Sequence, residues 1–289
     1  MIVVVGDIAV DIVSTLRTPL VRGSDAPAEI SLMPGGSGAN VAVWLARLGQ
    51  RATFVGRIGD DMFGRWLRDD LMAEGVAPAL VVDNTRRTGI IQVLVEPDGE
   101  RTMAPDRGAN AVWAQDDVSE TLIAEADLLH VVGYVLLDRA SQPGALAAMA
   151  YARKHGVPIS LDPSSHAPLL SLGSNAFWDL VGKVDLLLPN RHEAQALSGD
   201  QEPTEALRTL RKHAGTVVIK LDREGCIISE GDRVERIPAP AIQVVNATGA
   251  GDAFDAGFLA TWRPGEGLLA ACRAAVSLGA FAATLPTSR

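Results

Sequence analysis

The sequence predicts an α/β protein of three layers, in which a mostly parallel central sheet lies between two layers of helices. The first observation is that short runs of β-branched residues or leucine recur between helical patterns, at 2–5, 52–55, 128–132, 157–161, 184–188 and 216–220. This alternation is typical of parallel sheets covered on both faces. The second is that a glycine-rich segment opens an apolar helix near each end of the chain, at 35–40 and 246–252.

Polar residues and glycines follow the ends of these strands. They are Asp7 and Asp11 after the first strand, Gly56 after the second, Asp162 after 157–161, Asn190 after 184–188 and Asp222 after 216–220. Ligands of open α/β sheets bind at the carboxyl ends of the strands. We therefore expect these residues to converge on one edge of the sheet.

An antiparallel insertion interrupts the alternation after the second strand. Two strand-like runs, 89–96 and 100–103, flank Asp98-Gly99, and Asp-Gly between such runs signals a tight hairpin. A long extended segment, 11–34, precedes it in the chain and contains proline. The alternative is an ordinary surface hairpin.

Composition favours a cytoplasmic enzyme. A chain of 289 residues buries a sizeable core. A net charge of −9 without a basic run argues against a nucleic-acid surface. The two cysteines, Cys226 and Cys272, lack metal-ligand spacing, and the chain starts directly with a strand, so we expect a reducing compartment and no export. No apolar run reaches the roughly 20 residues of a membrane span.

The segment Asn246-Ala-Thr-Gly-Ala-Gly-Asp252 predicts an anion cradle that ends in a carboxylate base. Gly249, Ala250 and Gly251 would present backbone N–H groups at the positive end of the following helix. Asp252, in the first turn, could accept the proton of an attacking hydroxyl. The alternative for the same residues is a simple helix N-cap.

The second segment, Gly35-Gly-Ser-Gly-Ala-Asn40, opens another helix, and the pair resembles the two signatures of the PfkB carbohydrate kinase family, also called the ribokinase family. Further landmarks of that family follow in order. They are Gly6-Asp-Ile-Ala-Val-Asp11, Gly56-Arg-Ile-Gly-Asp-Asp-Met-Phe-Gly64, Pro189-Asn-Arg-His-Glu193 and Lys220-Leu-Asp-Arg-Glu-Gly225. The resemblance covers nearly the whole chain.

The resemblance implies a ribokinase-like fold as a single domain over 1–289, with a small β-sheet lid formed by about 12–34 and 88–105. It implies ATP-dependent phosphorylation of a primary alcohol of a small sugar, with Asp252 as the base. The acceptor-side residues that it implies are Asp11, Gly35, Gly36, Ser37 and Asn40. In ribokinase-like members the lid also pairs two subunits, so a homodimer is expected.

On the nucleotide side the resemblance implies that ATP meets Asn190, Lys220, Asp222, Gly225 and Gly251. Glu193 would organise hydrated Mg²⁺ through water, which suits a cation that keeps several waters. The alternatives are that Glu193 completes a helix N-terminus and that Lys220 is a strand-end lysine. Adenine is expected near 271–279.

Three departures from the ribokinase pattern concern the substrate and the cations. Ser37 replaces the lysine of GG-K-GAN, and Ala9 stands where an asparagine often contacts ribose. Asn246 replaces the aspartate that helps to hold a monovalent cation, which argues against potassium activation.

Other classes lack their motifs. The chain has no G-x-x-x-x-G-K-[ST], and 35–40 lacks both the third glycine and the preceding strand of a dinucleotide site. Two alternatives to a sugar kinase stay open: a nucleoside kinase of the same family that acts on a 5′-hydroxyl, and a non-catalytic sugar-binding relative.

Overall fold

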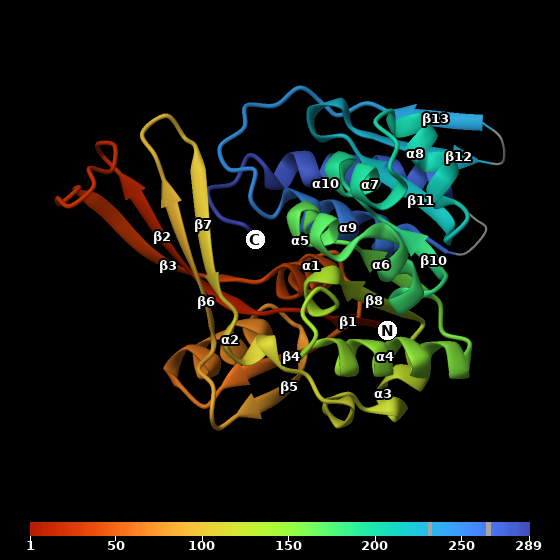
Figure 1. Cartoon of the computed structure of the whole chain (residues 1–289), viewed down its shortest axis with the longest axis horizontal. Coiled ribbons are helices and arrows are strands. Elements are labelled where there is room, and N and C mark those ends of the chain that lie inside the picture. The colour runs from red at the N-terminus through yellow and green to blue at the C-terminus, as the bar shows by residue number, and fades with distance from the viewer. Residues whose placement is uncertain (231–232, 264–266) are drawn as a thin grey trace.

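A large sheet runs through the centre of the protein in the computed structural model, which describes residues 1–230, 233–263 and 267–289 (Figure 1). Within these residues its strand order is β13-β12-β11-β10-β9-β8-β1-β4-β5. The strands are β1 (Ile2–Val5), β4 (Ala52–Gly59), β5 (Ala77–Asp83), β8 (Leu128–Val132), β9 (Ile159–Asp162), β10 (Val184–Leu187), β11 (Ala214–Lys220), β12 (Cys226–Glu230) and β13 (Arg233–Ile237). All neighbours are parallel except β12 and β13, which form an antiparallel edge.

Helices cover both faces of this sheet. One face carries α1 (Ser37–Arg47), α2 (Met62–Ala73), α9 (Ala250–Thr261) and α10 (Leu268–Ala282). The other carries α3 (Glu120–Ala124), α4 (Gln142–His155), α5 (His166–Leu172), α6 (Ser174–Val181), α7 (Arg191–Ser198) and α8 (Pro203–Leu210). Because alternate residues of a strand point to opposite faces, Val4 belongs to the first core and Val3 to the second.

A separate small sheet projects from one side of the large one (Figure 1). Its order is β3-β2-β6-β7, from β2 (Ala9–Leu16), β3 (Ala28–Gly35), β6 (Gly89–Val95) and β7 (Arg101–Asp106). The β2–β6 pair is parallel, and the other two pairs are antiparallel. We call this small sheet the lid.

The predicted fold class is confirmed, and all six predicted strands of the large sheet are present. The expected hairpin is β6 and β7. The sequence did not reveal β5, which lies at the sheet edge and contains Pro78, nor the antiparallel pair β12 and β13. No helix in the described part of the chain is long and apolar enough to cross a membrane.

Candidate active site

The two glycine-rich segments meet at the carboxylate of Asp252. This residue lies in the first turn of α9. The Ser37 hydroxyl donates to Asp252 Oδ1 over 2.6 Å, and the Asn40 side-chain amide donates to Oδ2 over 2.8 Å. Ser37 and Asn40 both lie in the first turn of α1. The N-terminal segment therefore orients the carboxylate that the C-terminal segment supplies.

Burial raises the pKa of the Asp252 carboxyl to about 7, although the hydrogen bonds from Ser37 and Asn40 oppose the shift. The nearby charges of Asp162 and Asp7 raise it further. A carboxylate with a pKa near neutrality is well matched to accepting a proton from a hydroxyl at physiological pH. The base role of Asp252 stays a prediction.

The glycines of the cradle have different tasks. Gly249 caps α9 with φ of +80°, and a Cβ there would lie 2.2 Å from the Ser288 carbonyl oxygen, so the fold itself requires glycine. Gly251 is exposed, and the nearest described atom to a Cβ there is Lys220 Nζ at 3.9 Å. Because Gly251 has no side chain, the backbone of the first turn of α9 is uncovered there. The Ala250 N–H already donates to the Ala247 carbonyl over 3.2 Å.

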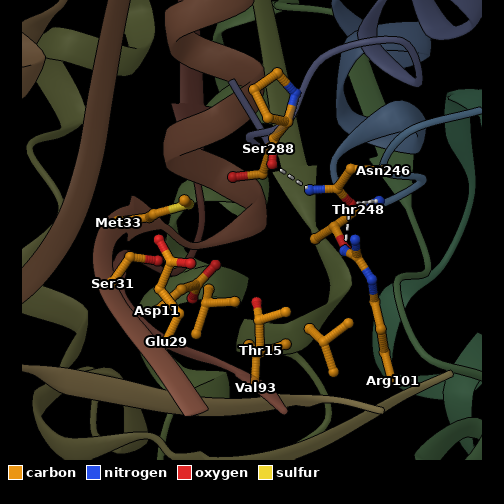
Figure 2. A pocket seen from close by; sticks show the side chains of 13 residues that line it. Asp11, Thr15, Glu29, Ser31, Met33, Val93, Arg101, Asn246, Thr248 and Ser288 are labelled. Atoms are coloured by element: carbon orange, nitrogen blue, oxygen red, sulfur yellow. Dashed lines mark hydrogen bonds between the residues drawn. The ribbon is translucent and has the colours of Figure 1, made fainter. Parts of the chain in front are cut away.

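A cavity of about 280 Å³ opens between the lid and the loops that precede and follow α9 and α10 (Figure 2). Its lining comprises Asp11, Val13, Thr15, Glu29, Ser31, Met33, Val93, Val95, Arg101, Asn246, Thr248, Pro286 and Ser288. Of the acceptor-side residues expected from the sequence, Asp11 alone is among the described lining residues. The lid segments 12–34 and 88–105 were expected, but the sequence did not single out which of their side chains line the cavity. The alternation at 11, 13 and 15 and at 29, 31 and 33 is a strand signal that could have identified them.

Two buried oxygen atoms near this region have no hydrogen-bond partner among the described residues: Asp11 Oδ1 and Asn40 Oδ1. Gly35 packs so closely on Asp11 that a Cβ there would lie 2.5 Å from the carboxylate oxygens. Burial, with the charge of Asp7, raises the pKa of Asp11 to about 6. Unsatisfied buried acceptors are costly, and a ligand hydroxyl would satisfy them.

Gly36 contributes through its backbone. It has φ of +93°, and a Cβ would lie 2.5 Å from the Ile8 Cα atom. This residue lets α1 start directly against the segment that follows β1. Ser37 and Asn40 hold Asp252 in this structure, and their expected contact with the acceptor stays a prediction.

Lys220 ends β11 in a buried group of charges. Its ammonium donates to Asp162 over 2.9 Å and to Asp255 over 3.0 Å. Burial alone would raise the pKa of Asp162, but the charge of Lys220 overcomes it and lowers the pKa to about 2. Burial holds the pKa of Asp255 well above its ordinary value despite Lys220. The Lys220 ammonium is therefore held by two acidic side chains, and it also lies next to Gly251, where a Cβ would be 3.9 Å from Nζ.

Asn190 and Glu193 start α7 as a reciprocal cap. The Asn190 side chain accepts from the Glu193 N–H over 2.9 Å, while Glu193 accepts from the Asn190 N–H over 2.8 Å and from its side-chain amide over 2.6 Å. Burial raises the pKa of Glu193 to about 7. The structure thus realises the helix-start alternative, and the magnesium role stays a prediction. No group of three or more acidic, His or Cys side chains in the described residues is arranged to hold a metal.

A larger groove, of about 840 Å³, lies beside the mouth of α9. The sequence-predicted residues in its lining are Lys220, Asp222, Gly225 and Gly251; Asn190 and Glu193 are not among the described lining residues. Val276 and Gly279 fall within the range expected for adenine. The sequence did not indicate Arg191, Arg223, Ile242, Val244 or Phe254, which also line the groove.

A model of the pfkB family of carbohydrate kinases matches residues 1–288. The chain belongs to this family. Among curated PfkB relatives, maize fructokinase-1 is 31% identical over 265 residues, which are 88% of this chain and 80% of the relative. Ribokinase of Bacillus subtilis is 28% identical over 275 residues, which are 94% of this chain and 89% of the relative. The resemblance seen in the motifs is thereby confirmed.

A solved structure extends the agreement to three dimensions. The fructokinase of Vibrio cholerae, solved with fructose, ADP and calcium bound, superposes with a TM-score of 0.81 at 27% identity, over 99% of this chain and 94% of that one. This PfkB protein is accordingly a carbohydrate kinase, and its acceptor and the roles of its residues are proposals.

Proposed function

We propose that this kinase transfers the terminal phosphoryl group of ATP to a primary hydroxyl of a small neutral sugar, with Asp252 as general base. The observation that carries the proposal is the Asp252 carboxylate, which Ser37 and Asn40 hold in the first turn of α9, next to the bare surface at Gly251. A positioned carboxylate beside helix-end amides supplies the base and the anion site that phosphoryl transfer requires.

The acceptor sugar would lie under the lid. The unpartnered Asp11 Oδ1 and Asn40 Oδ1 suit hydroxyl donors, and Thr15, Glu29 and Ser31 of the lid add oxygens around the cavity. Among the described lining residues the acidic Asp11 and Glu29 outnumber the one cation, Arg101, so the cavity disfavours an anionic acceptor. That the V. cholerae relative binds fructose supports a neutral sugar.

The nucleotide would occupy the larger groove, with its terminal phosphate at the start of α9. Because the Ala250 N–H is already used, the amides of Gly251 and Asp252 are the ones that would meet the phosphate. Lys220 lies next to this point and adds positive charge. Mg²⁺ with its waters would be held on the Glu193 side and would neutralise phosphate charge.

In the reaction, Asp252 takes the proton of the sugar hydroxyl while that oxygen attacks the γ-phosphorus in line. The new P–O bond forms as the bond to the ADP oxygen breaks. The amides at the start of α9 stabilise the negative charge on the transferring group.

The test is ADP release with Mg-ATP across pentoses, hexoses, sugar acids and nucleosides, with Asp252→Asn in parallel. We expect turnover with neutral sugars, and a loss of about 10²- to 10⁴-fold in the variant with nucleotide binding kept. Near-normal turnover of the variant would remove Asp252 from the base role. A response to nucleosides alone would replace the sugar with the family's other acceptor class.

We also propose that the lid pairs two subunits. Ile30 and Leu32 are exposed on the lid face opposite to Glu29 and Ser31, and exposed apolar patches mark contact surfaces. Light scattering should give the mass of a dimer, and Ile30→Glu with Leu32→Glu should give a monomer; an unchanged mass in the variant would place the contact elsewhere.

The buried free thiols of Cys226 and Cys272 support a cytoplasmic location.

A further inference from the structure

Arg101 connects the lid with the segment in front of the cradle. The residue starts β7, and its Nη1 donates to the side-chain oxygens of both Asn246 and Thr248 (Figure 2). Arg101 and Asn246 are 145 residues apart in the chain. A guanidinium stays charged at any physiological pH and its donors have a fixed geometry, so this contact defines the position of both partners.

The segment that receives Arg101 is itself ordered by hydrogen bonds. Asn246 Nδ2 donates to the Pro286 carbonyl over 2.9 Å, and Asn246 Oδ1 also accepts from the Thr248 N–H over 2.8 Å. Thr248 directly precedes Gly249, the residue that caps α9. A displacement of Arg101 would therefore reach the start of the helix that carries Asp252 within a few bonds.

The other polar contacts of the lid are of a different kind. Gln92 donates to the Ile12 carbonyl and the Ser14 hydroxyl, and Arg87 pairs with Asp106. These bonds join one part of the lid to another or to its own connecting segment. Arg101 instead joins the lid to the segment in front of α9, and all three residues of this contact line the cavity.

We propose that Arg101 is a positioning residue for phosphoryl transfer. Its guanidinium joins the lid strand β7 to the Asn246–Thr248 turn. The inference rests on the proposed function. The position of the lid and the order of the first turn of α9 then change together. An acceptor that holds the lid closed therefore also orders the backbone amides that would bind the phosphate. Arg101 acts through Thr248 and Asn246 and does not itself exchange protons or phosphate.

Removal of the guanidinium should affect the acceptor more than the nucleotide. Arg101 lines the acceptor cavity, whereas the described lining of the larger groove does not contain it. We expect Arg101→Ala to lower kcat/KM for the acceptor about tenfold to a hundredfold, the scale of one charge-assisted hydrogen bond, with a higher acceptor KM and a lower kcat. The KM for ATP should change less than about threefold.

The experiment compares Arg101→Ala with Arg87→Ala, a matched lid arginine whose ion pair is exposed. Thr248→Val and the double variant Arg101→Ala with Thr248→Val complete a double-mutant cycle. If Arg101 acts through Thr248, the losses of acceptor kcat/KM in the two single variants are not additive in the double variant, and Arg101→Lys recovers part of the activity. Additive losses, or an equal loss in Arg87→Ala, would overturn the proposal.

Hydrogen exchange of the backbone amides gives a readout that does not need turnover. In Arg101→Ala, exchange should rise both in β7 and at 246–251, and in Arg87→Ala it should not rise at 246–251. Unchanged exchange at 246–251 would overturn the tie even in an active enzyme. A wild-type protein that phosphorylates no acceptor, but shows this pattern, would refute the proposed function while retaining the contact. If Arg101→Ala does not fold, Thr248→Val and Arg101→Lys supply the same comparison.

Discussion

At the scale of single residues, the site depends on carboxylates whose surroundings set different protonation behaviour. Burial raises the pKa of Asp252 to about 7, whereas Lys220 lowers the pKa of Asp162 to about 2. The two acids share one edge of the sheet, yet at neutral pH only the first is poised to exchange a proton. Asp162 serves as a fixed negative charge.

The pKa of Asp252 predicts how activity depends on pH. The base must be ionised, so kcat/KM for the acceptor should rise as pH increases through about 7 and level off above it, with a fall of about tenfold per pH unit on the acid side. Initial rates at acceptor concentrations well below KM, measured across the pH range, check this. The Asp252→Asn variant should lose the acid limb, and a wild-type rate that is constant from about pH 5.5 to 8 would contradict the assignment.

Lys220 predicts a stability effect. Lys220→Met would leave Asp162 and Asp255 buried without their cation, which should cost about 3–5 kcal/mol of unfolding free energy. Asp162, with its lowered pKa, contributes stability that is present above its ordinary pKa of 3.8 and is lost as pH falls towards about 2. The difference in unfolding free energy between Lys220→Met and the wild type should therefore be largest at neutral pH and smaller in acid, where the carboxylates without their cation take up protons. Urea unfolding at several pH values measures this difference.

The exposed Lys183 gives the control for this prediction. Lys183→Met should change the unfolding free energy by less than about 0.5 kcal/mol. Equal losses in the two lysine variants would show that the buried charge group has no special weight.

At the scale of elements, two helix starts make the site. α1 begins at Gly36 and supplies Ser37 and Asn40, while α9 begins at Gly249 and supplies Asp252. The glycine positions put the helix ends against one another, and the strands beneath fix their direction. A helix start suits the binding of a phosphoryl group, because its first N–H groups lack partners within the helix.

Gly249 and Gly251 predict opposite outcomes for the same substitution. Gly249→Ala needs a left-handed backbone and places a Cβ against Ser288, so it should lower stability by about 1–3 kcal/mol. Gly251→Ala meets only Lys220 Nζ at 3.9 Å, an ordinary contact, so the fold should keep its melting temperature, while the KM for ATP rises because the methyl group covers the phosphate site. Thermal melts and ATP titrations of both variants decide it. A normal ATP KM in Gly251→Ala would move the phosphate away from this helix start.

At the scale of the whole molecule, a permanent cation joins the lid to the loop in front of α9. Arg101 occupies the side-chain oxygens of Asn246 and Thr248, and Asn246 carries no charge to attract a metal ion. We therefore predict that potassium does not stimulate the enzyme. Rates measured in potassium and in tetramethylammonium at equal ionic strength should agree within about twofold. A clear potassium requirement would show that the oxygens are free for a cation during turnover.

Sequence patterns predicted those parts of the molecule that local chemistry determines. Buried strands such as β8 are continuous apolar runs, and Gly249, Gly251 and Asp252 form a motif within four residues. Arg101 gave no such signal, because its partners lie 145 residues later and only the folded chain brings them near. β5 escaped because Pro78 and partly exposed side chains obscure a strand at the sheet edge. The cap formed by Asn190 and Glu193 was foreseen as an alternative.

The contact between Ser37 and Asp252 spans 215 residues of chain. During synthesis Ser37 and Asn40 leave the ribosome long before Asp252, whose carboxylate they orient. A nascent chain that ends before Asp252 therefore lacks the proposed base. Such distant contacts form late, because much chain entropy must be lost before they are made. The appearance of activity during refolding should therefore follow the burial of the core, and a nascent chain should not phosphorylate the acceptor before α9 has emerged.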